Sequence, residues 1–416
     1  MKALFRNAMV YENGAMKKQS MLFDGTTLSV VTDAASVGDV SVFDNTVILP
    51  GFCDVHVHFR EPGFSYKETV ETGCAAAARG GYTAVGTMPN LNPAPDTPEH
   101  LGLQLDRIRE GATIAVIPYG TITKSELGEE LSDMEGMAAD VLGFSDDGRG
   151  VQDREMMRAA MLKAKSLGKL IVAHCEDNSL LNGGYIHDGE YARAHGHRGI
   201  CSASEYEPIK RDIELIKETG VGYHVCHVSA AGSIEAIRAA KAEGVNITCE
   251  TGPHYIVLDD GCLKEDGKFK MNPPLRSPED RKEVLKGLLD GTVDMIATDH
   301  APHSAEEKSR GLEKSAMGVV GLETAFPVLY THLVKPGILP LERLVKLMSD
   351  NPRERFKITT DPGFTVFDTA CEYEVNPEDF LSKGKATPFE GMKLYGKCLL
   401  TVYGGKAVYK DKKLSI

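Results

Sequence analysis

Two histidines separated by one residue are the first indication of chemistry in this sequence. His56 and His58 belong to the segment GFCDVHVHFREPG at 51–63. The apolar residues around them predict a β-strand over 52–58, in which alternate side chains share one face. Two imidazoles on one face can bind a single divalent metal ion, although two unrelated strand histidines would also fit this pattern. Arg60 continues the alternation, so its side chain is expected on the same face.

Other histidines and aspartates follow predicted strands at their carboxyl ends. They are Asp146 and Asp147 after 141–145, His174 at the end of 169–174, His227 at the end of 222–227, and Asp299 after 294–298. In a closed barrel of parallel strands, all carboxyl ends meet at one mouth. Four imidazoles and two or three carboxylates would then surround one point, and this set of donors suits Zn²⁺. The sequence therefore predicts a metal site in which one Asp of the doublet can bridge two ions.

The elements that must position these residues alternate between strands and helices. Apolar runs rich in Val and Ile predict strands at 52–58, 83–87, 114–120, 141–145, 169–174, 222–227, 246–251 and 294–298. Helical patterns between them predict helices, for example at 67–79, 98–110, 153–167, 205–218, 231–243 and 278–289. Eight parallel strand–helix units within roughly 300 residues favour an α/β fold, a closed (β/α)₈ TIM-like barrel over 46–352.

The two ends of the chain have a different pattern. Residues 1–45 and 353–416 contain short alternating segments, such as LFRNAMVYENG, separated by Gly and Asn turns. This pattern predicts a small β-sandwich built from both chain ends. Packing the ends together would also bring the termini close to each other, as is common in domains.

Charge and composition exclude several classes of protein. The net charge is −13, which argues against nucleic acid or an anionic membrane as a partner but permits a small anionic substrate. No apolar run approaches a membrane span and no signal peptide is recognisable, so a cytoplasmic protein is expected. The nine cysteines are scattered without a CxxC pair, which argues against a disulfide framework.

Several motifs together resemble a known family. They are DVHVHFREPG, MPNLNP (88–93), GFSDDG (143–148), VAHCED (172–177), YHVCHVS (223–229), MNPPLR (271–276) and ATDHAPH (297–303). Their order resembles the amidohydrolase superfamily and, within it, the bacterial long-chain (class I) dihydroorotases, over nearly the whole predicted barrel. The resemblance implies a zinc-dependent cyclic amide hydrolase that interconverts N-carbamoyl-L-aspartate and L-dihydroorotate in pyrimidine biosynthesis.

The resemblance implies six zinc ligands. They are His56, His58, Asp147, His174, His227 and Asp299. The first metal position would combine the HxH pair with Asp299, and the second would combine the other two histidines. Adjacent residues of an extended chain point in opposite directions, so only one Asp of the doublet can bridge. The resemblance favours Asp147, with Asp146 behind it. One or two ions are compatible with the sequence, and two are expected.

The resemblance also implies residues that contact the substrate. They are His58, Arg60, Asn90, Asn272, His303, Met317 and Gly318. Arg60, with Asn90 and His303, would bind the substrate carboxylate, although an ion pair of Arg60 with Glu61 or Glu68 is the structural alternative. Asn272 would contact the ring, and Met317 and Gly318 would contact substrate through their backbone.

The implied mechanism is hydrolysis of a ring amide. Water bound to the metal would attack the carbonyl, and Asp299 would act as the catalytic general base and then as the general acid. His254 is expected near the site without a direct role, His224 is expected to be structural, and Cys175 and Cys226 are expected to point away from the mouth. His187 is among the histidines expected to be exposed to solvent.

Two alternative functions stay open at this point. The first is another cyclic amidase, a hydantoinase or dihydropyrimidinase. Such enzymes use a carboxylated lysine near the fourth strand, but this chain has no Lys between Lys124 and Lys163. The second is a catalytically silent subunit of aspartate transcarbamoylase, which should have lost metal ligands. A homo-oligomer, most simply a dimer, is expected, and association with aspartate transcarbamoylase is left open.

Overall fold

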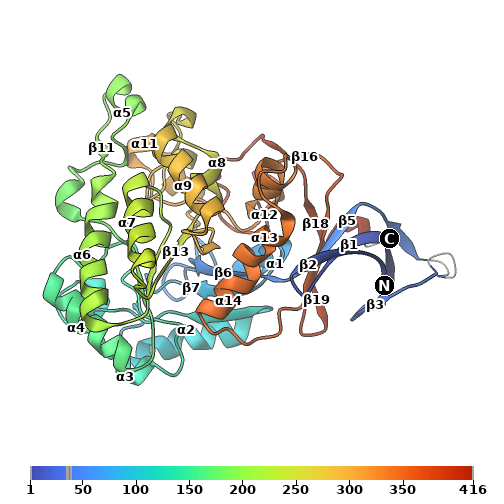
Figure 1. Cartoon of the computed structure of the whole chain (residues 1–416), viewed down its shortest axis with the longest axis horizontal. Helices are drawn as coiled ribbons and strands as arrows, with labels where there is room; N and C mark the ends of the chain where they lie inside the picture. Colours follow the sequence, from blue (N-terminus) through green and yellow to red (C-terminus); the bar gives the residue numbers. More distant parts are fainter. Residues whose placement is uncertain (1, 34–36, 38–39, 415–416) are drawn as a thin grey trace.

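A computed structural model describes residues 2–33, 37 and 40–414. The predicted end segments 1–45 and 353–416 include residues 1, 34–36, 38–39 and 415–416, which lie outside the described residues. Helices surround a central group of strands, and a curled β-sheet that contains both ends of the described chain extends from one side (Figure 1). No helix of the described residues is long and apolar enough to cross a membrane.

The central strands form a closed parallel ring. They are β6 (Phe52–Val57), β7 (Tyr82–Thr87), β8 (Ala115–Pro118), β9 (Ile171–Ala173), β12 (Tyr223–Val225), β13 (Ile247–Thr251) and β14 (Met295–Ile296). Parallel pairing joins them in two groups, β6-β7-β8 and β9-β12-β13-β14. Phe144 pairs with both Gly120 and Ile171 between the groups, and Val57 pairs with His300 at the other seam. The predicted barrel is therefore confirmed.

The fourth place in the ring differs from the predicted strand at 141–145. Only Phe144 forms bridges there, although Leu142 donates to Pro118 and Phe144 donates to Leu170. The backbone hydrogen bonds of this segment alternate between the two neighbouring strands, so the segment does not form a continuous ladder with either strand. The segment occupies the place of a barrel strand and brings the Asp doublet to the mouth.

Six long helices lie at the predicted positions. They are α1 (Val70–Arg79), α2 (Pro98–Gly111), α4 (Arg154–Ser166), α6 (Ala203–Thr219), α7 (Ala231–Ala242) and α9 (Pro278–Asp290). The side chains of Thr69, Thr97, Asp153 and Ser277 cap four of them by accepting from the first-turn backbone. Shorter helices are α3 (Met134–Met137), α5 (Glu190–His195), α8 (Pro253–Val257), α10 (Ala305–Lys308), α11 (Gly311–Lys314), α12 (Ala325–Leu329), α13 (Leu341–Val345) and α14 (Asn351–Arg355).

Both chain ends contribute to one eight-stranded sheet. Its strands are β1 (Ala3–Glu12), β2 (Ala15–Phe23), β3 (Leu28–Val30), β4 (Ser41–Phe43), β5 (Thr46–Pro50), β15 (Phe364–Asp368), β18 (Lys397–Tyr403) and β19 (Lys406–Lys410). Their order is β19-β18-β15-β5-β1-β2-β3, with β4 paired to β1. A small β-sandwich was predicted from the chain ends, and the strands that they contribute form a single strongly curled sheet (Figure 1). Two short pairs lie outside it, β10 (Ile186–His187) with β11 (Gly199–Ile200) and β16 (Tyr373–Glu374) with β17 (Lys393–Leu394).

An aromatic stack joins the barrel to the curled sheet. The ring of Phe367 on β15 lies 5.7 Å from that of Phe52 on β6 and 4.0 Å from that of Phe326 on α12. All three side chains are fully buried.

The boundary between the sheet and the barrel differs from the expected one. β5 pairs with β1 and β15 in the sheet, whereas the expected boundary at residue 46 would assign β5 to the barrel. We therefore propose that the barrel begins after Pro50.

Candidate metal-binding active site

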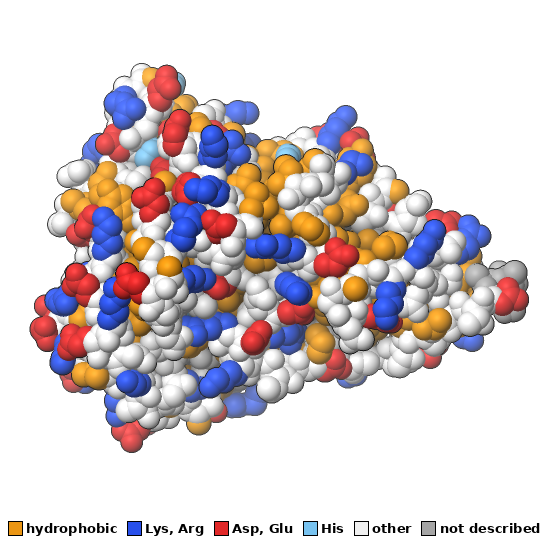
Figure 2. Space-filling model, in the orientation of Figure 1, with side chains coloured by type: hydrophobic (Ala, Val, Ile, Leu, Met, Phe, Trp, Pro, Cys, Tyr) orange, Lys and Arg blue, Asp and Glu red, His pale blue; other side chains and the backbone are white. Residues whose placement is uncertain are grey.

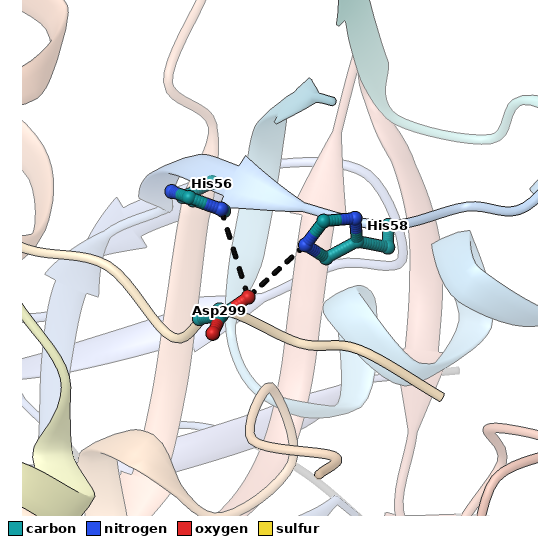
Figure 3. Close-up of side chains that lie close together, drawn as sticks. All are labelled: His56, His58 and Asp299. Carbon is teal, nitrogen blue, oxygen red and sulfur yellow. Dashed lines mark hydrogen bonds and ion pairs between the residues drawn. The ribbon is translucent and has the colours of Figure 1, made fainter. Parts of the chain in front are cut away.

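The closing seam of the barrel brings the HxH pair next to Asp299. His56 lies on β6, His58 follows it, and Asp299 follows β14. The Oδ1 atom of Asp299 is 3.0 Å from Nε2 of His58 and 3.6 Å from Nε2 of His56 (Figure 3). The side chains converge because the backbone N–H of His58 donates to the carbonyl of His300, which fixes the register of the two strands. All three are buried.

Asp147 lies in the middle of the four imidazoles. Its Oδ1 is 3.3 Å from Nε2 of His56, 3.7 Å from Nε2 of His227 and 3.8 Å from Nδ1 of His174. Its Oδ2 is 3.6 Å from Nε2 of His58. One oxygen of this carboxylate therefore faces His56, His174 and His227, and the other oxygen faces His58. The structure brings all six predicted ligands together.

Asp146 points the opposite way, as alternation along an extended chain requires. Its carboxylate accepts hydrogen bonds from the backbone N–H groups of Ile122 (2.7 Å) and Thr123 (3.0 Å), and from the Thr123 hydroxyl. Burial raises the pKa of Asp146 to about 6 despite these donors. Asp147 is thus the acid among the imidazoles, and Asp146 holds the loop behind it.

The donor atoms of this cluster fit a metal ion. Nδ1 of His58 contacts Oδ1 of Asn90 at 2.9 Å, and Nδ1 of His56 contacts a Glu250 carboxylate at 2.8 Å, so each Nδ1 is assigned the proton. Each Nε2 then faces a carboxylate oxygen, so the nitrogen and the oxygen could bind one cation between them. Nε2 of His56 and Oδ1 of Asp147 are buried without a hydrogen-bond partner. Nitrogen and carboxylate donors in this arrangement suit zinc.

Two groups of three could hold an ion with ligand atoms within 4.8 Å of one another. They are His56, His58 and Asp299, and His56, Asp147 and His227. A third group, His56 with Cys226 and Glu250, is also buried. Burial raises the pKa of the Cys226 thiol well above its ordinary value, which disfavours a thiolate ligand there.

The charges of the cluster are strongly coupled. Burial alone would lower the pKa of His56, but Asp147 and Cys226 together, through charge and hydrogen bonding, raise that pKa well above its ordinary value. Burial would raise the pKa of Asp299, yet the adjacent imidazoles, His58 foremost, lower it to about 2. The imidazoles likewise hold the pKa of Asp147 well below its usual range. Both acids are therefore ionised and ready to bind a cation.

Two acids at the site were not anticipated from the sequence. Glu250 on β13 contacts His56 through Oε1 (2.8 Å) and His224 through Oε2 (3.2 Å). Oε2 of Glu176 lies 3.6 Å from Nε2 of His174. Both occur near a strand end, in TCETG and VAHCED, so the rule that identified the other acids could have found them. His224 has the structural role expected of it, as the second partner of Glu250.

Arg60 and Asn90 form the expected polar wall beside the cluster. The buried guanidinium of Arg60 donates from Nε to the carbonyl of Pro302 (3.3 Å) and from Nη1 to Oδ1 of Asn90 (3.5 Å). The alternative partners have other contacts, since Glu61 accepts from the backbone of Val70 and Glu68 accepts from Thr72 and Ser382. Arg60 is thus a buried cation with donors available for an anion.

Both ring nitrogens of His303 are already engaged. Nδ1 lies 3.2 Å from Nζ of Lys67, which can only donate, and Nε2 donates to the carbonyl of Met317 at 2.7 Å. Burial, with Arg60 and Lys67 nearby, lowers the pKa of His303 to about 3. The ring is therefore neutral and holds the backbone at Met317, and a direct contact with substrate requires it to give up one of these bonds.

The remaining predicted substrate contacts lie around the same opening. Nδ2 of Asn272 is 3.5 Å from Nε2 of His174, and its Oδ1 is buried without a partner. Gly318 adopts φ +135°, and a Cβ atom there would lie 2.7 Å from the carbonyl of Ala301. Only glycine fits this close approach.

Other histidines, among them His187, His254 and His300, are also buried. Burial lowers the pKa of His254 to about 4, and its Nε2 has no hydrogen-bond partner. His187 was expected to be exposed, but it is buried on β10, which pairs with β11.

Comparisons with known proteins agree on one family. A family model described as Dihydro-orotase-like matches residues 45–233. A dihydroorotase from Fusobacterium nucleatum subsp. nucleatum is 48% identical over 420 residues, covering 99% of each chain. Dihydroorotases from Shouchella clausii (48% over 417 residues, 97% of each chain) and Bacillus cereus (45% over 424 residues, 99% of each chain) are similar.

Solved structures show the same architecture at lower identity. An L-hydantoinase (dihydropyrimidinase) from Arthrobacter aurescens has a TM-score of 0.84 and 24% identity, covering 98% of this chain and 96% of that one. A dihydropyrimidinase from Brevibacillus agri has a TM-score of 0.81 and 23% identity, covering 99% and 96%. These two matches establish a shared fold, a barrel with a small β-domain.

Proposed function

This chain belongs to the dihydroorotase family of cyclic amide hydrolases, and we propose that it interconverts N-carbamoyl-L-aspartate and L-dihydroorotate in pyrimidine biosynthesis. The observation that carries this proposal is the position of Asp147, whose two carboxylate oxygens face different imidazoles at the barrel mouth. A buried cation, Arg60, lies beside the cluster, where the α-carboxylate of either substrate would be neutralised.

We propose zinc as the metal, with two ions per chain. His56, His58 and Asp299 would hold one ion, His174 and His227 would hold the other, and Asp147 would bridge them. When bound, zinc supplies Lewis acidity and lowers the pKa of a coordinated water to about 7. The unpartnered Nε2 of His56 and Oδ1 of Asp147 support this assignment.

Asp299 is the proposed catalytic residue. In ring opening, its carboxylate accepts the proton of the attacking water and then delivers it to the leaving ring nitrogen. In ring closure, it takes a proton from the ureido nitrogen and delivers it to the carboxylate oxygen, which leaves as water with a second proton from solvent. Its low pKa keeps it ionised at neutral pH, which is the form that a general base requires.

The other proposed contacts orient the substrate. Arg60 and Asn90 bind the α-carboxylate, and His58, next to Asn90, lines the same side. Asn272 and the backbone of Met317 and Gly318 hold the ring. His303 contributes by fixing Met317 and exchanges that bond if it touches the carboxylate.

The two alternatives are less well supported. A hydantoinase or dihydropyrimidinase binds rings that lack the α-carboxylate, so it has no need of the Arg60–Asn90 wall. A silent subunit of aspartate transcarbamoylase should lack ligands, whereas all six lie in one cluster here. The experiment compares turnover of L-dihydroorotate, dihydrouracil and hydantoin by zinc-loaded protein. We expect turnover of dihydroorotate alone, and preferred turnover of either other ring would overturn the assignment.

The bridge is tested separately with two matched variants. Asp147→Asn should lose zinc, measured by metal analysis after dialysis, and most of its activity. Asp146→Asn changes the neighbouring residue identically and should keep its zinc while its thermal stability falls, because Asp146 binds the loop at Ile122 and Thr123. Full zinc content in Asp147→Asn would contradict the bridge.

We further propose that the protein acts in the cytoplasm as a homodimer on a small-molecule substrate, with no nucleic-acid or membrane partner. Charged side chains of both signs are interspersed on the face shown in Figure 2, which supports the absence of a polyanion partner. Light scattering tests the dimer. Co-migration with purified aspartate transcarbamoylase tests whether the two enzymes associate.

A further inference from the structure

A buried lysine beside the active site has no role in the proposed chemistry. Lys308, the last residue of α10, is only 7% exposed, and no carboxylate among the described residues lies within salt-bridge distance of its ammonium. Its Nζ donates instead to three backbone carbonyls, those of Lys270 (3.0 Å), Ala316 (2.8 Å) and Gly318 (2.7 Å). A protonated amine has three N–H donors, so each donor of the Lys308 ammonium has one carbonyl acceptor.

The three carbonyls belong to two segments that line the opening of the site. Lys270 is two residues before Asn272, whose side chain approaches His174. Ala316 and Gly318 flank Met317, whose carbonyl accepts from His303. The backbone N–H of Gly318 also donates to the carbonyl of Lys270, so the two segments are in direct contact at the ammonium. Beyond Gly318, Val319 pairs with His300, next to Asp299.

We propose that Lys308 is a positioning residue that holds the segments 270–272 and 316–318 together, and thereby fixes the backbone and the Asn272 amide that face the substrate ring. The proposal rests on the dihydroorotase function proposed above. Lys308 touches neither substrate nor a proposed metal ligand. It acts through the carbonyls, because each lies one or two residues from a proposed substrate contact.

The charge of Lys308 matters for this role. Burial, with the Lys270 ammonium nearby, lowers the pKa of Lys308 to about 7, although Asp266 and Glu307 oppose the shift. The neutral amine has two N–H donors and a lone pair, so deprotonation leaves one carbonyl without a donor. The segments should therefore be held less firmly as the pH rises above about 7.

The test compares Lys308→Met, Lys308→Arg and a control, Lys268→Met, in the zinc-loaded full-length protein. Lys268 lies in the same region, but its ammonium binds Glu390 at the surface. Measurements are KM and kcat for L-dihydroorotate from pH 6 to 9, bound zinc, and hydrogen exchange of backbone amides. We expect Lys308→Met to raise KM about 10-fold or more with kcat and zinc nearly unchanged, and to speed exchange over 316–320. Lys268→Met should match the parent protein.

Lys308→Arg keeps a charge at every pH tested. The parent protein should show a rise in KM above pH about 7 that Lys308→Arg lacks, even if the Met variant does not fold. The same rise in Lys308→Arg, or unchanged KM and exchange in a folded Lys308→Met, would overturn the proposal. If the parent protein does not turn over dihydroorotate, the proposed function fails, and the exchange measurement still decides the role of Lys308.

Discussion

Nδ1 of His56 lies 2.8 Å from a carboxylate oxygen of Glu250, across the interior of the barrel. The second oxygen of Glu250 contacts His224, and its backbone partner is Val228, which follows His227. This arrangement fixes the tautomer of His56 and aims Nε2 at Asp147 and Asp299. A carboxylate that accepts from the far nitrogen of a metal-binding histidine also makes that imidazole a stronger ligand.

Glu250→Gln should therefore weaken zinc binding. The amide keeps the size of the side chain but removes its charge, and we expect a loss of metal affinity of about 10- to 100-fold. Competition with a chromogenic chelator measures this directly. Glu235→Gln, on the exposed face of α7, is the control and should bind zinc like the parent protein. Equal affinity in Glu250→Gln would exclude this orienting role.

Arg60→Met should impair substrate binding more than chemistry. The substitution keeps an apolar stem but removes the cation proposed to bind the α-carboxylate, so kcat/KM for dihydroorotate should fall about 100-fold, mainly through KM. Steady-state kinetics at saturating zinc provide the measurement. Arg149→Met, at an exposed position of the loop after the Asp doublet, is the control. A fall in kcat alone would assign Arg60 to another role.

His187→Leu should remove part of the acid sensitivity of folding. Burial, with Arg276 nearby, lowers the pKa of His187 to about 4, below the value of about 6.5 expected in the unfolded chain. Between these values the unfolded state binds the proton and the folded state does not, so stability is lost as the pH falls from 6.5 toward 4. The loss should reach at most about 1.4 kcal/mol per pH unit in the parent protein and be smaller in the variant.

Urea unfolding at pH 7 and pH 5 provides the measurement for His187. The difference between the two pH values should shrink in His187→Leu. His195→Leu is a control on the neighbouring helix α5, where the side chain is exposed, and it should leave the difference as it is in the parent protein. The same difference in all three proteins would show that His187 titrates normally.

Gly318→Ala should damage the active site while a matched glycine tolerates the same change. A Cβ at Gly318 would lie 2.7 Å from the Ala301 carbonyl and 3.1 Å from the His303 ring, so the backbone beside Asp299 must shift. We expect kcat/KM to fall by at least about 10-fold. Gly337 also has a positive φ, but an added Cβ meets nothing within 4 Å. Gly337→Ala should affect only stability.

Much of the site could be predicted because the position of a residue within its own strand determines where its side chain points. His56 and His58 share a face through simple alternation, and Asp299 lies at a strand end, where every parallel barrel opens. The doublet shows the limit of this reasoning. Alternation predicts that the side chains of Asp146 and Asp147 point in opposite directions, but it does not say which of them faces the imidazoles. That depends on the loop at Ile122 and Thr123, whose backbone N–H groups bind Asp146.

The rest depends on contacts between distant segments. Glu250 becomes relevant only because closure of the barrel places it against His56. His187 is buried on β10, and the pairing of β10 with β11 spans only two residues, too few to give a periodic pattern in the sequence. The ring of His303 is held by Lys67 and Met317, and no spacing in the sequence indicates either partner.

The curled sheet has a consequence for how the chain folds as it leaves the ribosome. β5 pairs on one side with β1 and on the other with β15, and roughly 300 residues separate β5 from β15. At about 5–20 residues per second, translation of that interval lasts tens of seconds. During this time the edge of β5 that later pairs with β15 has no partner strand, and an unpaired edge favours association with other chains until the last strands emerge.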